Sequence, residues 1–353
     1  MTALAWSDRV WAAAETRGPC RIAPEDIERG VSLARRPVFI CGVHRSGTTL
    51  IRDLLDSHPA LSVLPAEGTL HSNRWSRIVG PTDASLRAVA CEWVRRLANH
   101  SNQPPFWLLG RSSSVDSPYV SFARALMAWW FIVERALGRD TRSWTLVAVA
   151  LAYAYCNAGG RIAPAALRWV EKTPANERFI NRLLAEFPDA RIIHVIRDPM
   201  AVFNSRKIME LHTSAAFRNV RAVLRDLART YRVAIACSDA NLSDRYLLIR
   251  YEQLVNDQRV TISRLAAFLG IQPLPILWRP TIGGVLAGSN SSYESGEVKG
   301  RILADDEHMP HRTLTGAEKL LVATVVGRSA NRLGYGISAV SGLRATLRRI
   351  AYR

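Results

Sequence analysis

The chain has 353 residues, a formal net charge of +17 at pH 7, and 48% hydrophobic and 22% charged residues. This composition is typical of a folded globular protein, so it excludes disordered, collagen-like and disulfide-scaffold classes. The excess of Lys and Arg predicts affinity for anions, but it does not distinguish a nucleic acid, an anionic membrane or a phosphorylated small molecule. The length suits about two domains or one large α/β domain with an insertion.

The cysteines and the hydropathy pattern indicate which cellular compartment to expect. The five cysteines are widely spaced and form no CxxC pair, which argues against a disulfide framework and a cysteine-rich zinc site. We therefore expect a cytoplasmic protein, and the charged residues Asp8, Arg9 and Glu15 interrupt any secretory signal core. The apolar runs 126–133 and 144–156 are each shorter than the about 20 residues that cross a bilayer. They predict buried helices, with peripheral contact at the inner membrane surface as the alternative.

The first predicted elements surround a glycine loop. Residues 1–36 suggest an N-terminal helix and a linker. Residues 37–41 form a short apolar run typical of a buried parallel strand, and the loop 42–49 leads from it into a helix that stops at His58-Pro59. About a hundred mostly helical residues follow, which we interpret as an acceptor-side insertion at about 70–165.

Two further strand and helix pairs follow the insertion. A helix over 179–187 leads to a strand at 191–196, after which Asp198 is placed to cap a helix that begins at Pro199. A strand at 246–249 precedes a helix that Gly270 can terminate. Strands that alternate with helices predict a parallel sheet covered on both faces.

The fold class that we expect is therefore α/β, a P-loop-like three-layer fold with a central parallel sheet flanked by helices and a mostly helical insertion. We expect a single domain over 37–340, followed by a basic tail at 341–353.

The loop after the first strand has the spacing G-x-x-x-x-G-T-T from Gly42 to Thr49, which is the frame of a phosphate-binding loop. Its amides and the helix that follows would offer donors and partial positive charge to an anion. The lysine of a nucleoside triphosphatase is replaced by Thr48, which argues against a P-loop small-molecule kinase. Arg45 and Ser46 with two threonines suit a nucleotide with a short phosphoryl chain, and an ordinary glycine turn is the alternative.

Residues 38–50, VFICGVHRSGTTL, resemble the 5′-phosphosulfate loop of sulfotransferases that use 3′-phosphoadenosine 5′-phosphosulfate, PAPS. Residues 196–199 followed by Ser205 resemble the 3′-phosphate motif of that family. The blocks EKTP at 171–174 and RYEQLV at 250–255 match bacterial members and tyrosylprotein sulfotransferases. The four blocks cover roughly residues 37–270.

The resemblance implies sulfuryl transfer from PAPS to a hydroxyl acceptor, with adenosine 3′,5′-bisphosphate as the product and no metal. It places Arg45 against the phosphosulfate and Lys172 where charge develops in the transition state. Further nucleotide contacts are implied for Ser46, Gly47, Thr48, Thr49, Arg197, Ser205 and Tyr251, with a weaker match at Lys299 and Arg301.

A hydroxyl acceptor also requires a general base. Glu67 lies at nearly the family's spacing for its catalytic glutamate, and a solvated turn carboxylate is the alternative interpretation. His71 is the competing base, whereas His44 could simply line the loop.

The acceptor and partners remain open at this point. A glycan, a lipid and a small molecule all fit, and the positive charge favours an acidic or membrane-associated acceptor. No nucleic-acid-binding module is recognisable, although a non-enzymatic basic protein that binds nucleic acid or membrane is the second alternative. Residues 305–311 mix Asp, Glu and His, but Pro310 breaks the helix that would align them, so we expect a solvated loop.

Overall fold

The computed structural model describes residues 3–69, 83–99, 118–138, 144–212, 214, 216–240, 242, 244–288, 300–302 and 314–338. The chain divides into two compact units. Unit 1 comprises Met1–Phe39, Arg52–Arg191 and Leu274–Ala287, and unit 2 comprises Ile40–Ile51, Ile192–Pro273 and Gly288–Arg353. The single domain over 37–340 stays a prediction.

Five strands form a parallel sheet, which confirms the predicted α/β fold with flanking helices. Their hydrogen-bonded order is β2-β3-β1-β4-β5. In chain order the strands are β1 (Pro37–Cys41), β2 (Leu61–Val63), β3 (Arg168–Lys172), β4 (Arg191–Ile196) and β5 (Tyr246–Arg250). All of β1 and all but the first residue of β4 are buried, as expected of strands that are covered on both faces.

The elements around the glycine loop follow the sequence closely. The predicted helix after the loop is α3 (Thr48–Leu55), and the helix after β4 is α8 (Pro199–Leu211), with the Asp198 carboxylate accepting from the Ala201 amide at 2.8 Å. The helix α11 (Gln258–Leu269) ends at Gly270 in the left-handed conformation. The caps predicted at Asp198 and Gly270 are therefore confirmed.

Other expectations were incomplete. The predicted N-terminal linker is wrong in part, because α1 (Ala3–Arg17) is followed by a second helix, α2 (Pro24–Ala34), which begins at a proline. The helix predicted at 179–187 is present as α7 (Ile180–Glu186), but a 3-10 helix, Pro174–Phe179, that was not predicted precedes it. Sequence reasoning placed no strand at β2 or β3, since both are short and β3 ends on charged residues.

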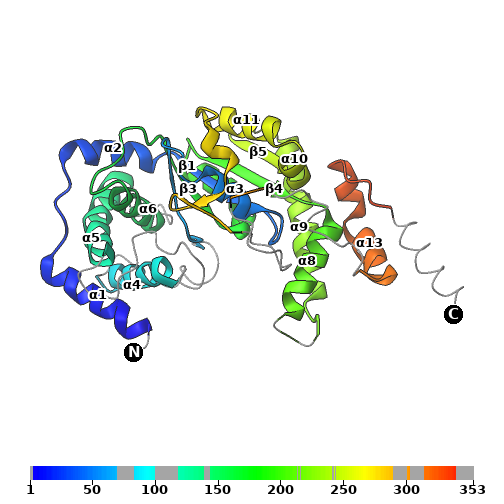
Figure 1. Cartoon of the computed structure of the whole chain (residues 1–353), viewed down its shortest axis with the longest axis horizontal. Coiled ribbons are helices and arrows are strands. Elements are labelled where there is room, and N and C mark those ends of the chain that lie inside the picture. Colours follow the sequence, from blue (N-terminus) through cyan, green and yellow to red (C-terminus); the bar gives the residue numbers. More distant parts are fainter. Residues whose placement is uncertain are drawn as a thin grey trace, which may run out of the picture. The chain divides into compact units, whose positions relative to one another are not determined.

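Unit 1 contains the helical insertion. Figure 1 shows α1, α4 (Asp83–Asn99), α5 (Pro118–Leu137) and α6 (Trp144–Asn157) gathered together. The α6 residues 144–154 are all buried, and the Trp130 and Trp144 rings meet edge to face with centroids 4.3 Å apart. The two apolar runs are therefore largely buried helices, as predicted. Within the described residues, no helix has both the length and the hydropathy of a membrane span.

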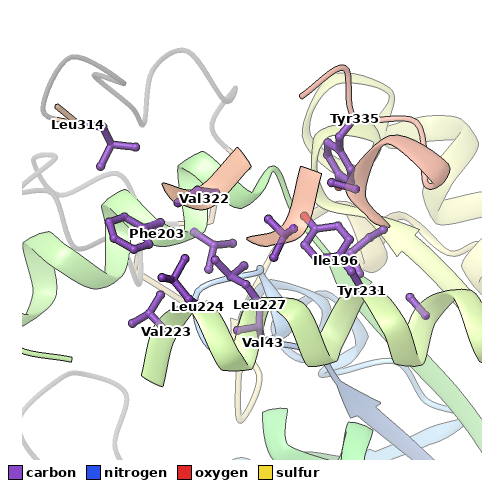
Figure 2. Packing of buried hydrophobic residues seen from close by; sticks show 14 residues of the cluster. Val43, Ile196, Phe203, Val223, Leu224, Leu227, Tyr231, Leu314, Val322 and Tyr335 are labelled. Atoms are coloured by element: carbon purple, nitrogen blue, oxygen red, sulfur yellow. The ribbon is translucent and has the colours of Figure 1, made fainter. Parts of the chain in front are cut away.

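Unit 2 places α8 against α9 (Val220–Asp239) and α13 (Gly316–Arg332), with α10 (Tyr251–Asn256) directly after β5. Figure 2 shows the core that these helices share, which includes Val43 of the glycine loop and Ile196 of β4. The N-terminus of α13 is closed by a capping box between Thr315 and Glu318, and Glu318 also pairs with Lys207 of α8 at 2.7 Å. The core thus supports the loop and the strand end that carry the candidate site.

Candidate active site

The glycine loop of unit 2 needs its glycines for space as well as for conformation. Gly42 has a φ of 142°, and a Cβ there would lie 2.2 Å from the Val195 carbonyl oxygen of β4. Gly47 has a φ of 100°, and a Cβ there would lie 2.4 Å from the ring of Tyr251. The backbone of the loop therefore packs directly on β4 and on Tyr251.

The loop also contains a buried hydroxyl group that makes no hydrogen bond among the described residues. Ser46 is fully buried, and its Oγ has no hydrogen-bond partner among the described residues. The next residues begin α3, with Thr48 buried and Thr49 half-buried. An unsatisfied buried hydroxyl beside a helix N-terminus matches the donor set that a phosphate or sulfate group requires. The residues present therefore fit the anionic group that the sequence predicts.

Arg45 joins the loop to the other predicted anion residues of unit 2. Its φ of 76° is uncommon for a residue with a side chain, and its Nε donates to the Ser205 Oγ at 3.0 Å. Arg197 Nη1 donates to the Arg45 carbonyl oxygen at 3.4 Å. The structure thus brings together Arg45, Arg197 and Ser205, which lie far apart in the sequence.

Arg197 is held through both its side chain and its backbone. Its guanidinium carbon lies 4.0 Å from the centroid of the Tyr251 ring, a cation–π contact. Its carbonyl oxygen accepts a hydrogen bond from Tyr231 Oη, and the amide of the next residue, Asp198, donates to Glu252 Oε1 at 2.7 Å. Sequence reasoning missed Tyr231 and Glu252, although Glu252 lies inside the RYEQLV block that pointed to this region.

In unit 1 the structure pairs two predicted catalytic residues. Lys172 Nζ lies 2.5 Å from Glu67 Oε1; the Lys172 side chain is only 6% exposed and that of Glu67 is 35% exposed. Burial lowers the pKa of Lys172 and the nearby Arg52 adds to this effect, while Glu67 opposes it. The arrangement is a buried ammonium that holds a carboxylate with partial access to solvent.

The segment that carries Glu67 is held in place by hydrogen bonds to its backbone. The Glu67 carbonyl oxygen accepts from Arg96, and the Gly68 amide donates to Glu171 Oε1 at 2.7 Å. Thr173 Oγ1 accepts from the Thr69 amide at 3.0 Å and donates to Glu171. Burial raises the pKa of Glu171, against these hydrogen bonds, which lower it. The EKT sequence of the matched block at 171–174 therefore fixes the turn that presents Glu67.

A second buried pair supports the same turn. Arg52 Nε donates to Asp53 Oδ1 at 2.7 Å, and Arg52 Nη1 donates to the Pro65 carbonyl oxygen at 2.6 Å. Burial raises the pKa of Asp53 to about 6, although Arg52 lowers it in part. No sequence motif had singled out this pair.

The remaining predicted residues divide into two groups. Arg301 is exposed, and among the described residues it makes no contact that supports a nucleotide role. Lys299, His71, the acidic and histidine-containing stretch 305–311 and the basic tail 341–353 lie outside the described residues. Within the part of the chain that the structure describes, no three His, Cys, Asp or Glu residues are grouped as metal ligands would be.

The chain is similar to known sulfotransferases. The family model described as "Sulfotransferase family" matches residues 37–275. Carbohydrate sulfotransferase 5 of Mus musculus is 29% identical over 164 residues, and the match spans 41% of this chain and 41% of that relative.

Solved structures of low identity also match. The sulfotransferase domain of the Synechococcus PCC 7002 olefin synthase is 21% identical, with coverage of 83% of this chain and 94% of that chain and a TM-score of 0.43. Sulfotransferase STF9 of Mycobacterium avium is 17% identical, with coverage of 76% and 84% and a TM-score of 0.39. The family model matches more than half of this chain, and the chain therefore belongs to the sulfotransferase family.

Proposed function

We propose that the chain transfers a sulfuryl group from PAPS to a hydroxyl acceptor. The observation that carries this proposal is the linked set of Arg45, Arg197 and Ser205 around a glycine loop that contains the unpartnered Ser46 hydroxyl. Two arginines and a serine suit a ligand with two separate anionic groups, because guanidinium groups form strong charge-assisted hydrogen bonds to phosphate oxygens. Family membership supports the same reaction.

The donor contacts follow from the loop. The amides and hydroxyls of Ser46, Thr48 and Thr49, with the Gly47 amide, would bind the 5′-phosphosulfate, and Arg45 would offset its charge. Arg197 and Ser205 would bind the 3′-phosphate, with Tyr251 stacked on the Arg197 guanidinium. Lys299 and Arg301 stay in the proposal only through the resemblance to the family.

The transfer itself requires an acceptor oxygen to attack sulfur while the bond from sulfur to the bridging phosphate oxygen breaks. The acceptor then carries the sulfuryl group, and adenosine 3′,5′-bisphosphate leaves. Glu67 would take the proton of the acceptor hydroxyl, and Lys172 would orient the Glu67 carboxylate and offset negative charge on the leaving oxygen. We propose no metal in this scheme, since the arginines and Lys172 supply the positive charge.

Saccharide hydroxyls are the first acceptor class to test, because the curated relative is a carbohydrate sulfotransferase. Lipids and small molecules are the other classes in the proposal. A cytoplasmic location, peripheral membrane contact and the absence of a nucleic-acid partner stay predictions.

Calorimetric titration tests the donor. We expect adenosine 3′,5′-bisphosphate to bind more tightly than adenosine 5′-phosphate or ATP, and Arg197→Ala to weaken the bisphosphate by roughly 10- to 100-fold, the value of one charge-assisted contact. Arg232→Ala, an exposed arginine on α9, is the matched control and should bind as the unaltered chain does. Preference for ATP with magnesium would favour the kinase alternative, and no nucleotide binding would favour a non-enzymatic anion-binding protein.

Transfer is tested with PAPS that carries labelled sulfur. Label should pass to a saccharide mixture, and no transfer to any hydroxyl class would contradict the proposed activity.

A further inference from the structure

Tyr335 lies well beyond the family match, which ends at residue 275, yet it belongs to unit 2 together with the residues that would bind the nucleotide. It follows α13 through Gly334, whose φ of 84° lets the chain turn back, and the Tyr335 amide donates to the Ala330 carbonyl oxygen at 3.1 Å. The side chain is 4% exposed. Figure 2 shows Tyr335 near Tyr231 and Ile196 at one end of the core.

The Tyr335 hydroxyl donates to Glu252 Oε2 at 3.0 Å. The other oxygen of the same carboxylate, Glu252 Oε1, accepts from the Asp198 amide at 2.7 Å. Glu252 therefore links the C-terminal end of α13 to the peptide bond that follows Arg197. Burial raises the pKa of Tyr335, and the Glu252 carboxylate raises it further, so the phenol keeps the proton that it donates.

The surroundings of Tyr335 leave its ring little freedom. The Arg250 guanidinium carbon lies 4.2 Å from its ring centroid, and the Tyr231 ring meets it edge to face at 5.9 Å. Tyr231 itself donates to the Arg197 carbonyl oxygen. Both polar groups of the peptide bond between Arg197 and Asp198 are thus tied, the carbonyl to Tyr231 and the amide to Glu252, and Tyr335 contacts both of these side chains.

We propose that Tyr335 is a positioning residue that acts through Glu252 to fix Arg197 for the nucleotide's 3′-phosphate. The proposal rests on the proposed function, because the 3′-phosphate is the group that Arg197 would bind. Loss of one hydrogen bond to a charged acceptor should weaken the affinity for the 3′-phosphate by about 3- to 10-fold. The effect should be selective, since the hydrogen bond and ring contacts described above join Tyr335 to Glu252, Arg250 and Tyr231.

The test compares Tyr335→Phe with the unaltered chain by titration with adenosine 3′,5′-bisphosphate and adenosine 5′-phosphate. We expect weaker binding of the bisphosphate and unchanged binding of the 5′-phosphate. Glu252→Gln, which alters the group that accepts the Tyr335 hydrogen bond, should show the same selectivity. Tyr155→Phe in unit 1 is the matched control and should change neither affinity.

A double-variant cycle separates positioning from a general structural role. In the Arg197→Ala background, Tyr335→Phe should cause no further loss of bisphosphate affinity, because the group that it positions is gone. Equal loss for both ligands, or additive losses in the cycle, would overturn the proposal.

A measurement on the protein without ligand tests the role of Tyr335 independently of the proposed function. Amide hydrogen exchange at Asp198 should become faster in Tyr335→Phe and stay unchanged in Tyr155→Phe, because Glu252 is then held from one side only. If the unaltered chain does not discriminate the bisphosphate from the 5′-phosphate, the proposed function fails, and unchanged exchange at Asp198 would overturn the link from Tyr335 as well.

Discussion

Replacement of Gly42 by alanine should destabilise the fold and remove nucleotide binding together. At a φ of 142°, a conformation that side chains rarely adopt, the backbone cost is about 1–3 kcal/mol. The added Cβ would lie 2.2 Å from the Val195 carbonyl oxygen, so one backbone segment has to move. Val195 lies in the ladder between β4 and β5, opposite Ile249, and such overpacking costs a further 1–3 kcal/mol or so. Together these costs predict a loss of about 4 kcal/mol in the free energy of unfolding.

Urea unfolding followed by far-ultraviolet circular dichroism measures this loss. The choice of signal matters because all ten tryptophans belong to unit 1, whereas Gly42 belongs to unit 2. Gly336→Ala is the matched control, since a Cβ there meets no atom within 4 Å, and it should change the free energy by no more than about 0.5 kcal/mol. A loss below about 1 kcal/mol in the free energy of unfolding of Gly42→Ala would refute the reasoning that the loop packs too closely on β4 to admit a side chain. Retained affinity for adenosine 3′,5′-bisphosphate would refute it as well.

Two further predictions concern unit 1. Glu67→Gln should lower the rate of sulfuryl transfer by about 100-fold or more and leave bisphosphate affinity unchanged, because general bases contribute roughly 10²–10⁴ to rates. Retention of a tenth of the rate in single-turnover assays would remove Glu67 from the role of base. Asp53 has a folded-state pKa of about 6 against an ordinary value of 3.8, so the folded chain keeps a proton that the unfolded chain loses. Its contribution to stability should therefore fall as pH rises from about 4 to 6, by up to about 3 kcal/mol, and level off above that. Urea unfolding at pH 4.5, 5.5, 6.5 and 8 should show the free energy of unfolding of the unaltered chain falling with pH relative to that of Asp53→Asn, and an identical pH dependence in the two proteins would contradict it.

Local sequence signals predicted the parts of the fold that depend on neighbouring residues. The loop 42–49, the cap at Asp198 and the left-handed Gly270 are each determined by a few adjacent residues, and the structure contains all three. The short strands β2 and β3 gave no such signal. Leu61–Val63 is too brief to show a period, and Glu171 and Lys172 look exposed in sequence although both are buried.

The contacts that position the site depend on tertiary structure. Arg45 and Ser205 lie 160 residues apart, and sequence reasoning assigned them to different phosphates before the structure joined them at 3.0 Å. Glu171 was matched as part of a block, but its role as an anchor for Gly68 depends on a segment 103 residues away. Residue identity therefore predicts which groups are present, whereas only the packed fold shows which of them are coupled.

That coupling bears on how a loop without the usual lysine would bind the proposed nucleotide. The residue after the second glycine is Thr48, which is buried, and the cation stands three residues earlier at Arg45. Arg45 adopts a left-handed φ of 76°, and the hydrogen bonds from its Nε to Ser205 and from Arg197 to its carbonyl oxygen offset that cost. One residue therefore connects the loop that would bind the 5′ group to the residues that would bind the 3′ group. A ligand with anions at both the 3′ and the 5′ positions of its ribose would use both sets at once, whereas the single phosphoryl chain of ATP would engage the loop alone. Selectivity for the bisphosphate over ATP then follows from the linked arginines, and it should decrease when either arginine is removed.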